Sequence, residues 1–267
     1  MDLTKSSVAL SRLILDAWNN YEETTDAIVP DTFPDIARIA AVYGSPQLKD
    51  DAPQSGRVLI SGAVRMTVLY VPEGGGALRR LDIPISFAHI EEAAGINEDS
   101  RLFVTCRVVA ADAHVMNSRK LSATATLSIC CRVFAPDTAQ LTDGFAETDN
   151  GLELLTTTHT VTVPSSVLRR EFTLMEDVNL PDHGRFREMF APRAEMRLSD
   201  CRLMNGKAVL KGDVALHMLA MTTDDTLENI DCVVPFTQIF EADGMTDNQQ
   251  ISVSFSVRHL DAELRDD

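Results

Sequence analysis

The sequence predicts a mainly β protein made of two tandem repeated β-sandwich-like domains, each with one short helix. Three observations predict this fold: apolar and polar residues alternate along several stretches, the second half of the chain repeats the first, and glycine-containing pairs occur where hairpins would turn. A period of two is typical of a β-strand with one buried face. Two domains also suit a chain of 267 residues.

The repeat appears in ungapped alignments. Gly56–Tyr70 aligns with Gly206–Ala220, and Leu81–Val115 aligns with Ile230–Leu264. Of these 50 aligned positions 14 are identical, whereas shared composition alone gives roughly three. The repeated motif consists of Pro30, Asp31, Gly56 and Gly62 in the first copy and of Pro181, Asp182, Gly206 and Gly212 in the second. We therefore expect one structural unit to occur twice, with small insertions in its loops.

A short helix is expected near the start of each copy. Pro34 suits a first helical turn, and Asp35 complements the helix dipole there. The helical spacing i, i+3, i+4, i+7 is followed by Ile36, Ile39, Ala40 and Tyr43, up to Gly44. The first three of these positions recur as Phe186, Met189 and Phe190.

The next element is a strand that follows a tight turn. Asn205-Gly206 is a strong hairpin signal, and Ser55-Gly56 holds the same place in the first copy. Alternation then runs from Val58 to Val68. Because so long a strand exceeds the usual length in a small domain, we expect Gly62 and Gly212 to mark a bulge or bend that splits it. Gly74–Gly76 is expected to form the tip of the following hairpin.

The last strands differ between the copies. Leu102–Val108 and Ile251–Val257 alternate alike, but the alternation over Leu121–Cys131 has no counterpart before Asp267. The second sheet should therefore lack an edge or central strand unless Thr158–Val163 or a neighbouring molecule supplies one. An unpaired strand edge would also permit self-association.

These patterns define three segments. Residues 1–135 form the first repeat with an N-terminal lead-in, and residues 152–267 form the second repeat, without the last strand of the first. Between them, residues 136–151 are rich in Pro, Gly, Asp and Thr with little apolar periodicity. This composition predicts a linker.

Charge and cysteine content exclude several classes of protein. The chain has 24 basic and 40 acidic side chains, a formal net charge of -16. Such an acidic protein lacks the basic surface that nucleic acids or anionic membranes require. No export signal and no apolar run long enough to span a bilayer is present, which predicts a cytoplasmic protein. The five cysteines are odd in number and form no C-x-x-C pair, so we expect free thiols.

With these motifs in view, the sequence resembles the SPOCS domain of SipL-like sporulation proteins of Firmicutes. In the first copy the likeness rests on three stretches, Val29–Ile39, Gly56–Tyr70 and Ile85–Phe87. In the second copy it is weaker and rests on Leu180–Asp182, Gly206–Gly212 and Pro235-Phe236. These motifs are not catalytic signatures.

The resemblance implies a non-enzymatic protein that binds other proteins. Its expected place is the mother-cell side of the forespore surface, during assembly of the spore envelope and coat, with spore-coat morphogenesis proteins as partners. Relatives commonly carry further SPOCS copies and a LysM module, which residues 1–267 do not contain.

Signatures of catalysis and of cofactor or metal binding are absent from the sequence. There is no phosphate-binding loop, no G-x-S-x-G elbow and no H-E-x-x-H pair. The strongest acidic candidate for a calcium site joins Asp112, Asp261, Glu91, Glu92 and Glu241, but solvent-facing turns account for these residues better. We therefore expect no catalytic residue, cofactor or metal.

A local basic cluster is the one candidate partner contact. It consists of Arg185, Arg187, Arg193 and Arg197. These residues could meet an acidic partner, although a solvated helix face explains them better.

Two other function classes stay open at this point. A carbohydrate or cell-wall binding β module would use exposed aromatic residues, but only 6% of the residues are aromatic. An enzyme of unrecognised type would need an active site assembled from distant residues.

Overall fold

The structure is a computed structural model that describes residues 3–145, 157, 159–180, 183–242, 245–247 and 249–265. The described chain is mainly β, as the sequence predicts, and it contains three antiparallel sheets of three strands each. Its one helical element is a 3-10 turn, η1 (His183–Arg185). Among the described residues no helix is long and apolar enough to cross a membrane.

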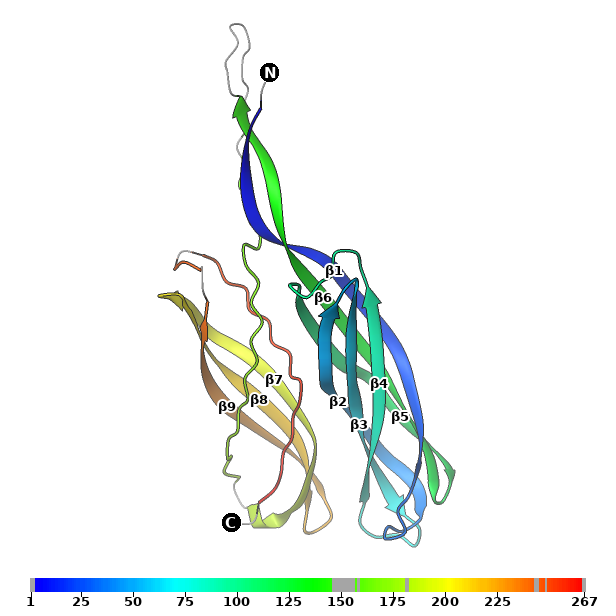
Figure 1. Cartoon of the computed structure of the whole chain (residues 1–267). Coiled ribbons are helices and arrows are strands. Elements are labelled where there is room, and N and C mark those ends of the chain that lie inside the picture. The colour runs from blue at the N-terminus through cyan, green and yellow to red at the C-terminus, as the bar shows by residue number, and fades with distance from the viewer. Residues whose placement is uncertain are drawn as a thin grey trace.

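The first two sheets pack face to face in the first half of the chain (Figure 1). One has the order β1-β6-β5, with the strands β1 (Leu3–Ile28), β6 (Lys120–Phe145) and β5 (Arg101–Asn117). The other has the order β2-β3-β4, with the strands β2 (Ile36–Gln54), β3 (Arg57–Pro72) and β4 (Arg79–Glu92). Their inward side chains form one continuous apolar core.

The third sheet lies in the second half of the chain. Its order is β7-β8-β9, with the strands β7 (Phe186–Met204), β8 (Lys207–Thr222) and β9 (Leu227–Glu241). Two extended segments, residues 159–180 and 249–265, run along one face of this sheet (Figure 1). Neither segment is part of a β-ladder, so the second layer of this half is not a hydrogen-bonded sheet.

The sheets β2-β3-β4 and β7-β8-β9 share their pairing geometry. In β2 the register shifts between Leu48 and Asp50, and in β7 it shifts between Leu198 and Asp200. Gly62 lies opposite Leu48, and Gly212 lies opposite Leu198. The predicted irregularity at the glycines is therefore a bulge in the neighbouring edge strand. The glycines do not split their own strands, because the sheet stays paired on both sides of them.

A close contact explains why glycine occupies these two positions. A Cβ atom at Gly62 would lie 2.3 Å from the backbone oxygen of Gln47 and 2.7 Å from Cζ of Phe87. At Gly212 the corresponding distances are 2.1 Å to the oxygen of Arg197 and 2.8 Å to Cζ of Phe236. Both separations are shorter than any real Cβ contact, so only glycine allows the aromatic ring to lie against the central strand.

The predicted hairpin turns are confirmed. Asn205 and Gly206 have φ angles of 52° and 74°, and Gly56 has a φ of 76°. Positive φ at both central residues is the property of a type I′ turn, which matches the twist of the flanking strands. The glycines of the Gly74–Gly76 tip also have positive φ, from 81° to 107°.

The expected short helix in each copy is wrong. Residues 36–54 form strand β2, and the positions that repeat it begin strand β7 directly after η1. The register of β2 shifts between Ile36 and Arg38 and again between Ile39 and Ala41. Each bulge adds one residue to the period of two, so inward side chains fall three residues apart and imitate a helix. Strand β7 repeats the effect with shifts at Phe186/Glu188 and Phe190/Arg193.

The expected linker is also wrong over residues 136–145. Strand β6 continues to Phe145, and this part pairs with the N-terminal part of β1, from Leu3 to Ser11. The two strands form a ribbon that projects from the body (Figure 1). Backbone hydrogen bonds between two strands form whether or not side chains pack against one face of the pair. A two-stranded ribbon therefore needs little apolar periodicity. Residues 146–151 lie outside the described residues.

The clearest test of the glycine contact is Gly62→Ala or Gly212→Ala. We expect either change to lower the free energy of unfolding by about 2 kcal/mol or more, because backbone must move to admit the new methyl group. Urea unfolding measures this loss. Gly184→Ala is the matched control, since a Cβ there would meet nothing within 4 Å. Equal stability of the Gly62 and Gly184 variants would contradict the steric account.

Candidate protein-binding surfaces

The four arginines proposed as a partner contact do not form a free basic patch. Arg185 belongs to η1, and the other three lie on β7. Arg185 pairs with Glu228, Arg187 with Asp225 at 2.5 Å, and Arg197 with Glu195 at 2.9 Å. Among the described residues Arg193 has no ion pair. Because three of the four charges are neutralised on the protein itself, the cluster offers an acidic partner little.

The motif residues are structural. Pro30 begins the turn after β1, where its oxygen accepts a hydrogen bond from Phe33 N at 2.9 Å. Arg119 holds this turn by donating to Val29 O at 2.9 Å and to the carboxylates of Asp31 and Asp35 at 3.2 and 2.6 Å. Hydrogen bonds from Arg119 and Ser118 lower the pKa of Asp35. The repeated Pro181 and Asp182 lie outside the described residues.

The acidic residues considered for calcium do not converge. No group of three or more His, Cys, Asp or Glu side chains able to hold a metal occurs among the residues described. Asp261 instead accepts from Arg65 at 2.9 Å, and Glu91 pairs with His89 at 2.5 Å. The hydrogen bond from Arg65 lowers the pKa of Asp261. These carboxylates therefore serve neighbouring cationic or histidine side chains.

All five cysteines are free thiols. Burial raises the pKa of Cys106 and of Cys131 to about 12, and it also raises the pKa of Cys201 and Cys232. A reactive cysteine needs a lowered pKa and access to solvent. Burial of these four thiols instead favours the protonated form, which is unreactive.

A buried carboxylate joins the two halves, and no sequence motif indicated it. Asp51 of β2 is only 3% exposed and accepts two hydrogen bonds from Arg169, at 2.7 and 2.9 Å. Arg258 donates a third, at 2.5 Å. The two arginines come from the two extended segments, so one carboxylate fixes both of them to the first half. Glu171 adds charge to the cluster at 2.6 Å from Arg169.

Backbone and apolar contacts extend this junction. Leu48 N donates to Arg258 O at 2.9 Å, and Ser256 Oγ donates to Val104 O at the same distance. A separate apolar cluster joins Leu69 of β3 to Phe190 and Met221 of the third sheet, all nearly fully buried. The halves are thus packed together along the edges of β2 and β5.

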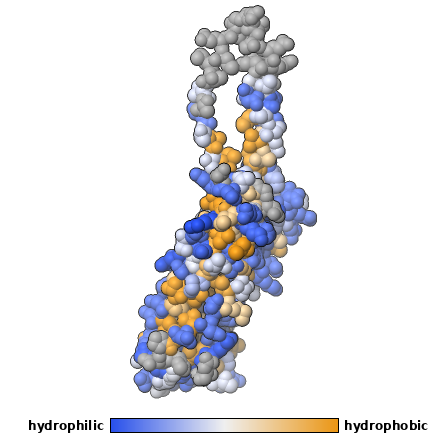
Figure 2. Space-filling view, turned by 90° about the vertical axis from the view of Figure 1, so that its left-hand side faces the viewer, coloured by the Kyte–Doolittle hydropathy of each residue, from blue (hydrophilic) through white to orange (hydrophobic). Residues whose placement is uncertain are grey.

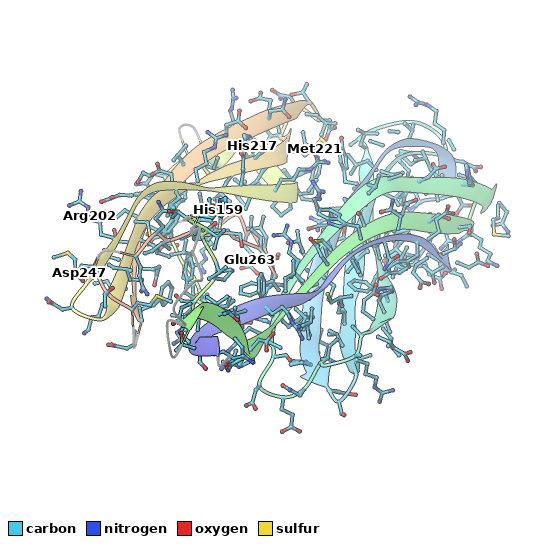
Figure 3. The ribbon with its side chains drawn as sticks, turned by 90° about the horizontal axis from the view of Figure 1, so that it is seen from above. His159, Arg202, His217, Met221, Asp247 and Glu263 are labelled. Carbon is cyan, nitrogen blue, oxygen red and sulfur yellow. The ribbon has the colours of Figure 1, made fainter. Side chains whose placement is uncertain are left out.

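In the second half, the layer that faces the sheet β7-β8-β9 consists of two extended segments that are not hydrogen-bonded to each other as strands. Among the residues described, the backbone of 159–180 makes one backbone hydrogen bond, from Ser11 N to Pro164 O at 2.7 Å. Segment 249–265 makes two, and neither joins it to 159–180. Seen from above, Glu263 on this layer and His217 on the sheet lie on opposite sides of the half (Figure 3). We call the pair of extended segments the open layer.

Apolar side chains are exposed on this half. Met175 of the open layer is 85% exposed, and Val233 and Ile239 of β9 are 65% and 60% exposed. Hydrophobic surface runs along the side that Figure 2 presents, between hydrophilic margins. Exposed apolar patches of this kind are typical of protein contact sites.

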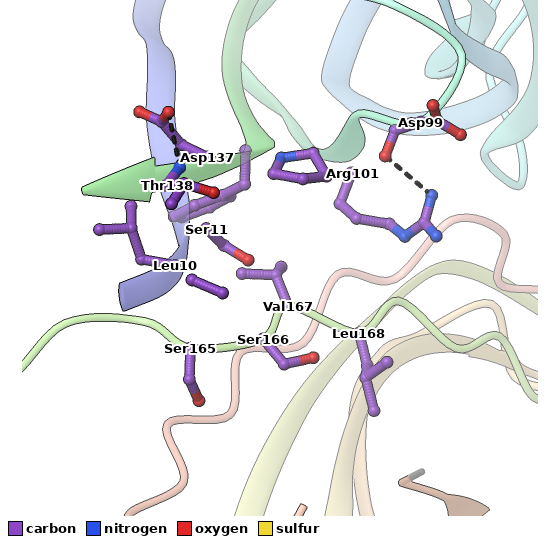
Figure 4. A pocket seen from close by; sticks show the side chains of 13 residues that line it. Leu10, Ser11, Asp99, Arg101, Asp137, Thr138, Ser165, Ser166, Val167 and Leu168 are labelled. Atoms are coloured by element: carbon purple, nitrogen blue, oxygen red, sulfur yellow. Dashed lines mark hydrogen bonds between the residues drawn. The ribbon is translucent and has the colours of Figure 1, made fainter. Parts of the chain in front are cut away.

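A shallow pocket lies where the open layer meets the projecting ribbon. It has a volume of about 460 Å³ and is lined by Ser165–Leu168, by Arg101 and by residues of β1 and β6 (Figure 4). Arg101 donates to Asp99 O at 3.1 Å, and Asp137 accepts from Thr138 N at 2.8 Å. Asp137 also pairs with Arg12 at 3.1 Å, so both charged groups already have partners, and no nucleophile with an adjacent base is among the residues that line the pocket.

The one tryptophan and two of the three tyrosines do not lie together on the surface that the structure describes. Trp18 is 55% exposed, with the Arg107 guanidinium 5.8 Å from its ring centre. Tyr70 is fully buried and donates to Pro34 O at 3.0 Å. Tyr21 packs edge-on against Phe87, with 6.4 Å between ring centres.

Comparison with known proteins gives one family match. Residues 35–116 match the family model described as SipL, SPOCS domain, which confirms the resemblance over the span from β2 to β5. Comparison with curated proteins and with solved structures gives no match.

The thiols give a chemical test of the core. We expect iodoacetamide at pH 8 to label Cys131 at least about 100-fold more slowly in the folded chain than in urea, because a pKa of about 12 leaves only about one thiolate in ten thousand. Mass spectrometry of timed samples reads the labelling. Half-buried Cys201 serves as the internal comparison, and equal rates for Cys131 with and without urea would contradict its burial.

The junction is tested by Asp51→Ala. Removing the carboxylate leaves the two half-buried guanidinium groups with Glu171 alone as an ion-pair partner, which we expect to cost about 2 kcal/mol of stability and to speed proteolysis of the segment around Arg169. Asp50→Ala is the matched control, because Asp50 is exposed and has no ion pair among the described residues. If both variants resist protease equally, the cluster does not hold the halves together.

Proposed function

We propose that this chain is a non-enzymatic protein–protein interaction module that acts in spore envelope and coat assembly, at the mother-cell side of the forespore surface. The match of residues 35–116 to the SPOCS domain carries the proposal. That match supports a sporulation-related domain, and the partners that suit it are spore-coat morphogenesis proteins.

The surface chemistry supports protein binding over catalysis. Exposed apolar residues lie on the second half, and the open layer has backbone groups without backbone partners among the described residues. Both features are typical of surfaces that receive another polypeptide. Within the part described, burial raises the pKa of Cys106, Cys131, Tyr21 and Tyr70, and the carboxylate of Asp51 is already paired with two arginines.

The architecture belongs to the same proposal. We infer that the chain is a tandem of two sandwich-like SPOCS-type units, the first containing β1 to β6 and the second beginning near residue 152. Two common features support this inference. Each central strand, β3 or β8, contains a glycine against which a phenylalanine ring packs, and in each half the edge strand has a bulge opposite that glycine. The net charge of -16 suits a partner whose contact surface is neutral or basic.

Localisation in a sporulating bacterium that carries this chain tests the proposal. We expect a fluorescent fusion to gather around the forespore and to co-purify, after cross-linking, with spore-envelope morphogenesis proteins identified by mass spectrometry. The fluorescent protein expressed alone is the control. Uniform fluorescence in the mother cell, with no envelope protein enriched above that control, would count against this role.

A further inference from the structure

The two halves differ by one strand. Strand β1 corresponds to residues 159–180, because Pro30-Asp31 after β1 aligns with Pro181-Asp182, and β5 corresponds to residues 249–265. In the first half β6 lies between β1 and β5 and pairs with both. Residues 1–267 contain no counterpart of β6. The position between the two segments of the open layer is therefore the position of a central strand.

Contacts on the sheet place both segments where the outer strands belong. Phe172 and Phe255 both contact Phe236, with 5.8 and 5.7 Å between ring centres. In the first half Tyr21 of β1 contacts Phe87, which is the aligned residue of Phe236. No backbone hydrogen bond links the two segments among the described residues, although arginine side chains from both reach Asp51.

Several side chains beneath this position are slightly more exposed than their counterparts, although Ala220, aligned with Tyr70, is fully buried. In β3 the inward residues Val58, Ile60, Val64, Met66, Val68 and Tyr70 are all 0% exposed. In β8 the aligned Leu210, Val214 and Met218 are 7%, 8% and 8% exposed, and Leu216 is only partly buried. Strand β6 supplies seven buried residues to the first core: Leu121, Ala123, Ala125, Leu127, Ile129, Cys131 and Val133. Among the described residues, the second core is covered by side chains of the two segments and not by a central strand between them.

We propose that the open layer receives one extended strand of a partner protein, which pairs with residues 159–180 on one side and residues 249–265 on the other. The strand would run antiparallel to both segments, as β6 does with β1 and β5. This inference rests on the proposed function in taking the ligand to be a protein.

The apolar side of the partner strand can be described. Its alternate residues should be apolar, since a strand over this sheet buries one face. Tyr21 pairs in register with Leu127, and Cys106 with Ile129. The second half has the rings of Phe172 and Phe255 in place of Tyr21 and Cys106, and Phe255 is much larger than cysteine. The partner residue opposite Phe255, at the position that Ile129 holds in β6, should therefore be smaller than isoleucine.

One charge of the partner strand follows from an ion pair in the first half. Lys120, the first residue of β6, lies 2.7 Å from Asp26 of β1. The aligned residue in the open layer is Asp177, whose side chain is 93% exposed and has only a 3.4 Å contact with Arg265. A lysine or arginine at the start of the partner strand would restore this pair.

A second copy of the chain is a poor donor of this strand. Every strand of the described chain already belongs to a sheet, and β6, which has the required pattern, is the centre of its own. Giving it up would remove seven buried apolar residues from the first core, a cost far above the gain of a few backbone hydrogen bonds.

A synthetic peptide of residues Arg119–Phe134 is the probe for the site. We expect saturable binding to the whole chain and, in hydrogen exchange, about ten-fold or greater slowing of amides in residues 165–180 and 250–264. Amides of β1, β5 and β6 should be unchanged. A peptide with Ile129→Ala should bind more tightly, and one with Ile129→Asp should not bind.

A fusion serves as the positive control. Appending Arg119–Phe134 after Asp267 continues the repeat, so the added strand should enter the same position, slow the same amides and block the free peptide. In the chain, Asp177→Asn should weaken peptide binding two- to threefold, roughly the effect of one exposed ion pair. Asp224→Asn, in the turn after β8, is the matched control and should leave binding unchanged.

Three results would overturn the proposal. The first is that amide exchange in the open layer is not slowed in the fusion. The second is that it is slowed in the fusion but not by the free peptide. The third is that it slows when the concentration of the chain is raised without any peptide. The second points to a strand of the same chain, and the third to self-association. All are independent of where the protein lies in a cell, so failure of the proposed function would be seen separately.

Discussion

Covering the apolar face of a central β-strand is the constraint on which the rest of this structure depends. In both halves a glycine in that strand admits a phenylalanine ring from the next strand, so the face becomes flat enough to pack at close range. The first half covers it with a complete sheet, and the central residues of β3 are fully buried. Bulges in the edge strand opposite the glycine give the sheet the twist that such packing requires.

In the second half the apolar face is covered by segments that are not part of a sheet and that are attached partly to the first half. Two extended segments cover the sheet β7-β8-β9, and they are held chiefly by side chains: aromatic rings on Phe236 and arginines on Asp51 of the first half. Because side chains hold the two segments in place, their backbone N–H and C=O groups are not used for this and could pair with a strand. The junction between the halves and the open layer are therefore one structural device, since the carboxylate that joins the halves also spaces the segments.

Much of the fold could be predicted because period-two alternation and turn glycines act locally. The hairpins at Gly56 and Gly206 follow from residues adjacent in sequence. The expected helix at Pro34–Gly44 failed because bulges, which depend on the partner strand, changed the spacing of Ile36 and Ile39. The Asp51 cluster could not be predicted, since Asp51 is 118 and 207 residues from its two arginines and each member is an ordinary surface residue type. The four arginines were visible in sequence, but the acids that neutralise them were not.

A strand that enters the open layer would gain from two sources of different character. Each backbone hydrogen bond contributes only about 1 kcal/mol, because it replaces bonds to water, and it is indifferent to sequence. Burial of alternate apolar side chains against β8 adds about 25 cal/mol per Å² and depends on register, since a slip of one residue turns every polar group inward. Affinity can therefore come from the backbone while selectivity comes from the pattern, with the Phe172–Phe255 pair and Asp177 fixing the position of the strand along the layer.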